Sequence, residues 1–173
     1  YNISPETFFN SIGEFLDIDD IVQSGLPNHR HEGITLKEFL IGNNLTICPT
    51  GCMFSKNIRG FLPELMQKLY DDRKTYQAKM KEAKKKLEVE TDPILKFALE
   101  KEVARNHNMQ LAKKIQLNSA YGALANVWFR WFDERYAESI TLSGQLSIKW
   151  IEKYINEYLV KIEKFLRENL NPD

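Results

Sequence analysis

The sequence has 173 residues, of which 43% are apolar, so it is long enough to form one ordinary domain or two small lobes around a buried core. Lysine and arginine (24) balance aspartate and glutamate (24), which excludes a protein that binds nucleic acid through overall positive charge. No apolar run could span a bilayer and no signal-peptide pattern is present, so we expect a soluble protein with no membrane partner. Because the sequence starts at Tyr1 rather than Met, we expect it to belong to a longer protein.

The first segment is predicted to be helical. Ser4-Pro5-Glu6-Thr7 contains the residues of a helix start, with proline where its missing N–H has no cost. An amphipathic run from Phe8 to Val22 follows, and a stretch rich in glycine, proline and asparagine begins at Gly25. We therefore expect one helix over residues 8–22 and a loop after it.

A short helix and a β-hairpin are predicted next. Thr35 and Glu38 have the spacing of a capping box, which predicts a helix that ends near Gly42. Two strand candidates, Leu45–Cys48 and Cys52–Ser55, flank a three-residue segment with proline and glycine. This pattern predicts a small antiparallel hairpin.

The cysteine and histidine residues do not predict a metal site. Cys48 and Cys52 are the only cysteines, and their C-x-x-x-C spacing lacks the second pair or the histidine that would complete a zinc site. His29 and His31 flank Arg30 in the loop-forming stretch, which favours a surface loop. We expect reduced cysteines and no metal bound by this chain.

Two long helices are predicted in the middle of the chain. Pro63 suits the first turn of a helix that runs to about Val89, and Asp92-Pro93 provides the N-cap and first residue of a second helix that runs to about Gly122. The tip between them is short, so we expect an antiparallel hairpin whose helices are each about 40 Å long. The apolar stripe of the first helix consists of Leu65, Leu69, Tyr76, Met80, Ala83 and Leu87.

Arg73 lies on this stripe, between Leu69 and Tyr76. A guanidinium that faces a partner helix needs an anion, and the neighbouring stripe residues supply none. The structural alternatives to a bound anion are an acid on the second helix or a side chain that extends to solvent. Residues 63–122 contain 13 Lys and Arg against 9 Asp and Glu, so this region is where we expect a polyanion to bind.

The last part of the chain is predicted to be an aromatic cluster followed by a long helix. The cluster Trp128, Phe129, Trp131 and Phe132 is expected to pack the root of the hairpin against the rest of the protein. A helix is predicted from Asp133 to about Leu170. Its apolar residues on or near one side are Ala137, Ile140, Leu146, Trp150, Ile151, Tyr154 and Leu159.

One face of the second long helix has the chemistry of a nucleotide site. Lys114, Asn118 and Tyr121 stand at i, i+4 and i+7, so a cation, an amide and an aromatic ring share one face. The ammonium can pair with a phosphate, the amide can bind a phosphate or sugar, and the ring can contact a base pair. Gly122 removes a side chain where another backbone could approach. The structural alternative is an amphipathic helix with a solvated lysine and a half-buried tyrosine.

The pattern K-x-x-x-N-S-x-Y-G, from Lys114 to Gly122, resembles motif B of the family B DNA polymerases, and the likeness is greatest to the replicative polymerases of large tailed bacteriophages. The resemblance implies that the two long helices are the fingers and that the protein works in the cytoplasm of an infected bacterial host. In that family a D-x-D triplet follows motif B and holds magnesium. Asp17-Ile18-Asp19 precedes motif B, so we do not expect it to be that site.

The resemblance also implies roles for individual residues. Arg73 and Lys114 would grip the β and γ phosphates of the incoming dNTP, and Asn118 would add a phosphate contact. Tyr121 and Gly122 would face the nascent base pair and template. From its location alone, we hypothesise further that Lys114 is the catalytic residue that protonates the departing pyrophosphate. The chain departs from the family at two positions, Gln77 and Ala125, where relatives often have lysine and glycine.

The predicted fold is therefore mainly α, with a long antiparallel helical hairpin on a partial α+β palm that contains a small β-hairpin. The predicted domains are a palm segment (1–59), the fingers hairpin with motif B (60–126) and a palm helix segment (127–173). The aspartates that hold Mg²⁺ in the complete enzyme would lie outside this chain, so we expect the chain alone to be inactive. Its expected partners are dNTP, primer-template DNA, and the remaining polymerase domains or a complementary subunit.

Two other functions are compatible with the residues themselves. The first is a helical interaction protein without enzymatic activity, whose hairpin docks on a partner. The second, which the neutral net charge disfavours, is a helical DNA-binding protein without catalysis, and it predicts tight, salt-dependent binding to duplex DNA. Substitution of Arg73 and Lys114 distinguishes these functions from the polymerase.

Overall fold

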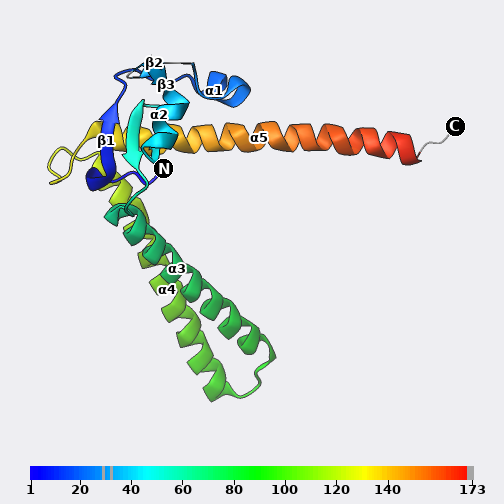
Figure 1. The fold of residues 1–173 in the computed structure, drawn as a ribbon. Helices are drawn as coiled ribbons and strands as arrows, with labels where there is room; N and C mark the ends of the chain where they lie inside the picture. Colours follow the sequence, from blue (N-terminus) through cyan, green and yellow to red (C-terminus); the bar gives the residue numbers. More distant parts are fainter. Residues whose placement is uncertain (29, 32, 171–173) are drawn as a thin grey trace. The chain divides into compact units, whose positions relative to one another are not determined.

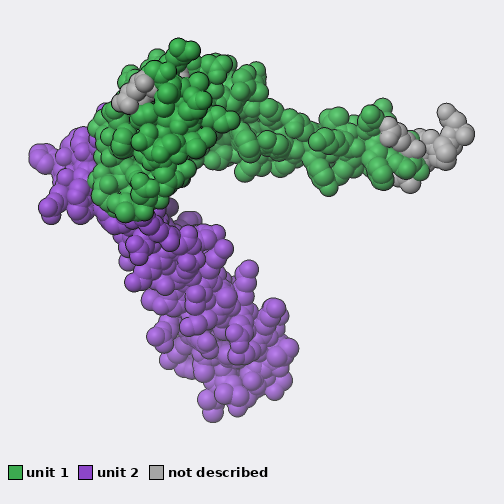
Figure 2. Space-filling model, viewed as in Figure 1, with its two compact units in different colours: residues 1–58, 135–173 green, residues 59–134 purple. Residues whose placement is uncertain are grey.

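The structure is a computed structural model that describes residues 1–28, 30–31 and 33–170. It divides into two compact units, and the second is inserted into the first (Figures 1 and 2). Unit 1 contains Tyr1–Ile58 and Arg135–Asp173, and unit 2 contains Arg59–Glu134. Most described residues are helical, which confirms the predicted fold class. The proposed boundaries of palm and fingers stay a prediction.

Unit 1 consists of a small sheet, short helices and the long helix α5. The strand order in the sheet is β1-β5-β4, and every pairing is antiparallel, while β2 and β3 form a separate two-stranded ribbon. The elements are a 3₁₀ helix Pro5–Thr7, β1 Phe8–Ser11, α1 Ile18–Ser24, β2 Arg30–His31, β3 Ile34–Thr35, α2 Leu36–Gly42, β4 Leu45–Ile47, β5 Cys52–Ser55 and α5 Glu134–Leu170.

The prediction of a helix over residues 8–22 is wrong. Phe8–Ser11 forms β1 instead, because it pairs with β5 and places Phe8 opposite Phe54. The Phe8 ring lies 5.9 Å from both the Phe54 and Tyr136 rings. These partners come from distant parts of the chain, so tertiary packing overrides a local pattern that fits a helix. Within residues 8–22 a helix forms only from Ile18, where α1 begins and the Asp17 carboxylate accepts a hydrogen bond from the Asp20 N–H.

The predicted capping box and hairpin are confirmed. The Thr35 hydroxyl accepts from the Glu38 N–H, and the Glu38 carboxylate accepts from the Thr35 N–H, at the start of α2. Strands β4 and β5 form the predicted antiparallel hairpin. The stretch predicted as a loop contains the strand β2, which includes Arg30, while His29 lies outside the described residues.

Unit 1 has one buried cluster that includes Leu36 and Phe39 of α2, and a second where the sheet meets the first turns of α5. Phe54 is fully buried and lies 6.0 Å, ring to ring, from Tyr136 on α5. The Thr50 and Ser139 hydroxyls, also buried, are hydrogen-bonded at 2.6 Å. The β4–β5 hairpin is therefore joined to α5 by an apolar contact from β5 and a polar contact from the turn.

Gly51 in this turn is expected to tolerate no side chain. Its φ of +76° is in the left-handed region, and a Cβ would lie 2.3 Å from the Glu14 carbonyl oxygen. We expect Gly51→Ala to lower the free energy of unfolding by about 2 kcal/mol or more. Gly42→Ala is the matched control, because a Cβ at Gly42 meets nothing within 4 Å. Urea titration of both variants measures the difference, and equal midpoints would contradict the prediction.

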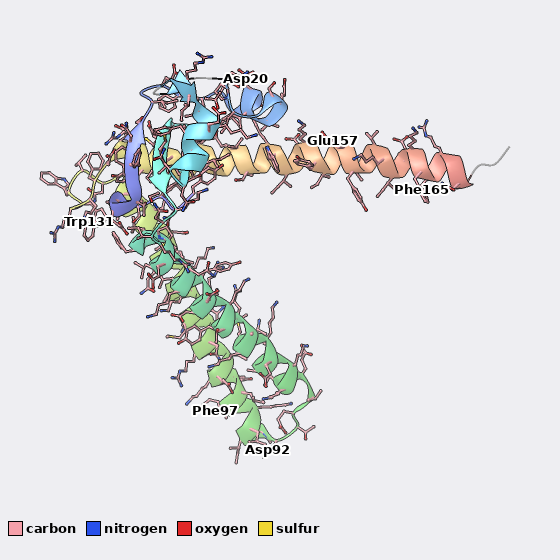
Figure 3. The ribbon with its side chains drawn as sticks, viewed as in Figure 1. Asp20, Asp92, Phe97, Trp131, Glu157 and Phe165 are labelled. Atoms are coloured by element: carbon pink, nitrogen blue, oxygen red, sulfur yellow. The ribbon has the colours of Figure 1, made fainter. Side chains whose placement is uncertain are left out.

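Unit 2 is the predicted antiparallel hairpin of α3 (Phe61–Val89) and α4 (Pro93–Leu124). The Asp92 carboxylate accepts a hydrogen bond from the Ile94 N–H at the start of α4, and Figure 3 labels Asp92 at the tip. The prediction of both helices and their short connection is confirmed.

At the root of the hairpin, aromatic side chains pack within unit 2. The Trp131 ring lies 5.2 Å from Phe61 at the start of α3 and 5.5 Å from Phe129. Trp128, in contrast, is 91% exposed. The predicted packing of this cluster against the rest of the protein stays a prediction.

The distal part of α5 carries exposed apolar side chains. Before this part of the helix, Lys149 forms an ion pair with Asp19, and Lys153 Nζ donates a hydrogen bond to the Val22 carbonyl. Figure 3 shows α5 continuing beyond them through Glu157 and Phe165. None of the helices in the described part of the chain is long and apolar enough to cross a membrane. The exposed apolar residues include Ile148, Ile151, Ile155, Tyr158, Ile162 and Phe165.

Candidate nucleotide-binding site

Helix α4 presents the three predicted side chains to solvent. It continues unbroken through Lys114, Asn118 and Tyr121 and ends at Leu124, two residues past Gly122. Lys114 and Asn118 are exposed, and Tyr121 is 45% exposed. A Cβ built on Gly122 meets nothing within 4 Å, so the surface next to the tyrosine is open. The cation, the amide and the ring are therefore accessible on one face of the helix.

Arg73 on α3 is half-buried, and its guanidinium does not make all the hydrogen bonds it could. Its Nε is buried and has no hydrogen-bond partner. Among the described residues, the structure pairs its guanidinium with no carboxylate, so the alternative of an acid on the other helix is not found. A buried guanidinium N–H without an acceptor is costly, and an anion that reached it would remove this cost.

The hairpin contains an ion pair that sequence reasoning missed. Lys113 Nζ on α4 lies 2.8 Å from the Asp72 carboxylate on α3, and the hydrogen bond from Lys113 holds the pKa of Asp72 below its ordinary value. A signal was present in the sequence. Asp72 and Lys113 are almost equally distant from Asp92 at the tip, and residues at equal distances from the tip of an antiparallel hairpin face one another.

This ion pair determines on which side of the hairpin the predicted site lies. Moving one residue along a helix turns the direction of the side chain by about 100° around the helix axis. In two antiparallel helices that face each other, moving one residue forward on each helix turns both side chains toward the same side of the hairpin. Arg73 and Lys114 each follow a member of the ion pair. They therefore lie on one side of the seam between α3 and α4, and the ion pair lies toward the other.

A cavity of about 680 Å³ lies on the side of the ion pair. Asp72 and Lys113 line it, together with apolar residues such as Leu65 and Leu69. None of the predicted residues Arg73, Lys114, Asn118 and Tyr121 lines it. The predicted nucleotide site is thus an open surface of the hairpin, and its placement there stays a prediction.

Comparison with known proteins identifies the family. The sequence profile described as DNA polymerase family B matches residues 1–172. The chain belongs to DNA polymerase family B. The resemblance first seen in motif B therefore extends over nearly the whole sequence.

Individual family B relatives come from phages and archaea. The DNA-directed DNA polymerase of Enterobacteria phage T4 is 34% identical over 151 residues, which cover 66% of this chain and 17% of that protein. The polymerase of Escherichia phage RB69 is 38% identical over 92 residues, or 53% of this chain and 10% of that protein. The DNA polymerase of Pyrococcus glycovorans is 35% identical over 104 residues, which cover 60% of this chain and 12% of that protein. The chain thus spans less than a fifth of these relatives.

A solved structure supports the fold. The family B DNA polymerase of the archaeon Pyrobaculum calidifontis aligns with 98% of this chain and 20% of its own, with a TM-score of 0.53 and 20% sequence identity. At this identity the similarity is one of fold alone.

The described residues do not fit the metal ions that family B polymerases use. No group of three or more His, Cys, Asp or Glu side chains in this part of the chain could hold a metal ion. Asp17 caps α1 and Asp19 pairs with Lys149, so the D-x-D triplet has structural roles. Burial raises the pKa of the Cys48 thiol to about 11, which disfavours the thiolate that binds metal.

Proposed function

We propose that α3 and α4 bind the triphosphate of an incoming dNTP and contact the nascent base pair during template-directed nucleotidyl transfer by a DNA polymerase. One observation carries this proposal. The exposed cation, amide and ring on α4 share a side of the hairpin with a guanidinium on α3 that lacks an acceptor. Phosphate oxygens are the acceptors that such a set of groups is suited to bind.

Each residue has a distinct part in the proposal. Arg73 and Lys114 neutralise the β and γ phosphates and hold the triphosphate in line for attack, which is the main contribution a protein makes to phosphoryl transfer. Asn118 donates to a phosphate oxygen, and Tyr121 lies against the nascent base pair, with open space at Gly122 for the template. Lys114 Nζ transfers its proton to the leaving pyrophosphate oxygen.

The remaining components come from outside the chain. Primer-template DNA and the other polymerase domains, or a complementary subunit, complete the enzyme in the cytoplasm of an infected bacterial cell. Mg²⁺ in that enzyme is held by carboxylates outside this chain.

We expect the purified chain to show no primer extension, because nucleotidyl transfer needs metal-binding aspartates that its described residues do not assemble. The same chain, placed as the corresponding segment of a complete family B polymerase, is expected to support extension. A gel assay with labelled primer and all four dNTPs measures both. Extension by the purified chain above a no-protein control would contradict the first expectation. A complete polymerase that carries this segment, binds DNA normally and extends no primer would contradict the second.

A further inference from the structure

The ion pair between Asp72 and Lys113 is the specific contact in the middle of the hairpin. Among the described residues, no other ion pair joins α3 to α4. Lys113 is well shielded, with 21% of its side chain exposed, and Asp72 has 42% exposed. Shielding strengthens an ion pair and reduces its screening by salt.

Apolar packing specifies this part of the hairpin weakly. The buried residues of α3 are Leu62 and Ala83, and those of α4 are Asn106 and Leu124. Between these two ends the apolar side chains of both helices, such as Leu69 and Tyr76, are at most half-buried, and the ion pair lies in that interval. Half-buried side chains fix the relative rotation of two helices less tightly than a buried core does, so a directional contact helps to fix the register.

The ion pair is adjacent in sequence to both phosphate-binding residues proposed above. Arg73 follows Asp72, and Lys114 follows Lys113. A slip of one residue along the helix would move a side chain by about 1.5 Å and turn it by about 100°. Such a slip would separate the two cations by more than the tolerance of a site that binds one triphosphate.

From these observations we infer that Asp72 and Lys113 are positioning residues, which hold α3 and α4 in the register that directs Arg73 and Lys114 at the same triphosphate. This inference rests on the proposed function. The pair acts from the opposite side of the seam, so it does not touch the nucleotide. Neither residue belongs to the motif that identified the site.

Neutralising Asp72 distinguishes this role from a simple charge effect. Asp72→Asn removes a negative charge near the site, so electrostatics alone would strengthen binding of the anionic dNTP. Loss of register would instead weaken it. In a complete family B polymerase carrying this chain, we expect Asp72→Asn to raise KM for dNTP about five- to tenfold, with a smaller change in kcat. The conservative variant Asp72→Glu and the exchanged pair Asp72→Lys/Lys113→Asp are expected to return KM to within about twofold of the original.

A matched control is the ion pair between Glu82 and Lys86, one turn apart on α3 and both exposed. Glu82→Gln is expected to leave KM unchanged. The register is measured in this chain as the distance between two spin labels. They are attached at Ala78→Cys and Asn108→Cys, two exposed positions on α3 and α4. Cys48 and Cys52 are each 1% exposed, so labelling is selective. The distance distribution is expected to broaden in Asp72→Asn and to narrow again in the exchanged pair.

The two measurements separate the possible failures. If Arg73→Met raises KM but Asp72→Asn leaves it unchanged or lowers it, the positioning role is overturned and the proposed function stands. An exchanged pair that restores neither KM nor the distance distribution would also overturn the positioning role. If KM responds to neither Arg73→Met nor Asp72→Asn, the proposed function fails, and the inference with it.

Discussion

Replacing Arg73 or Lys114 by methionine is expected to lower kcat/KM for dNTP about 10²- to 10³-fold in a complete family B polymerase that carries this chain. Each change removes a cation aimed at phosphate charge that develops in the transition state. Methionine keeps the length and apolar stem of the side chain, and it also removes the buried Arg73 Nε that lacks a partner. The folded state is therefore expected to be at least as stable as before. Single-turnover kinetics at varied dNTP concentration measure the loss.

The control for both variants is Lys74→Met. Lys74 follows Arg73 on α3, but its Nζ lies 4.6 Å from the centre of the Tyr70 ring on the same helix. We expect this variant to keep normal kinetics.

The outcome decides between the polymerase and the two other functions. If Arg73→Met and Lys114→Met extend primers normally, the hairpin is better explained as an interaction surface for another protein. If instead the chain alone binds duplex DNA tightly, with an affinity that falls steeply as salt rises, the third function is favoured.

Phe54→Ala is expected to have the largest effect on stability, lowering the free energy of unfolding by about 3–5 kcal/mol. Phe54 is 0% exposed, and its ring contacts Phe8 on β1 and Tyr136 on α5. Truncation leaves a cavity between the sheet and α5 that these large rings cannot fill without leaving their preferred rotamers.

Phe15→Ala provides the comparison, because Phe15 belongs to the same unit and is 64% exposed. Its effect is expected to be within about 0.5 kcal/mol. Chemical denaturation followed by circular dichroism measures both variants. A loss below about 1 kcal/mol for Phe54→Ala would mean that the sheet and α5 do not share a core in solution.

The elements that the sequence predicts well are those encoded by neighbouring residues. Asp92 and Pro93 specify the start of α4 through one hydrogen bond and one fixed φ angle, and Thr35 and Glu38 specify α2 through a reciprocal pair. The length of α5 follows in the same way from an uninterrupted pattern of apolar residues. In each case the deciding interaction spans only a few residues.

The sequence does not predict an element whose deciding contact is made by a residue far away in the chain. Strand β1 exists because Phe8 pairs with Phe54, and no pattern within residues 8–22 contains that information. The Asp72–Lys113 pair was overlooked for a related reason, since its two residues meet only when the hairpin is closed. The candidate site lies between these cases: motif B and Arg73 could be found from residue types and spacing, while their roles toward a nucleotide stay predictions.

The insertion of unit 2 into unit 1 has a consequence for the order of folding during synthesis. Unit 2 is made of two consecutive helices in contact with each other, so it can fold soon after it leaves the ribosome. Unit 1 cannot be completed so early, because Thr50 and its partner Ser139 are separated by 89 residues. Strands β1, β4 and β5 can pair with one another within residues 1–58, but Phe54 stays uncovered by α5 until the entire hairpin has been translated. This interval exposes apolar side chains of the sheet that α5 later covers, and a chaperone that binds apolar segments would act on the nascent chain at this stage.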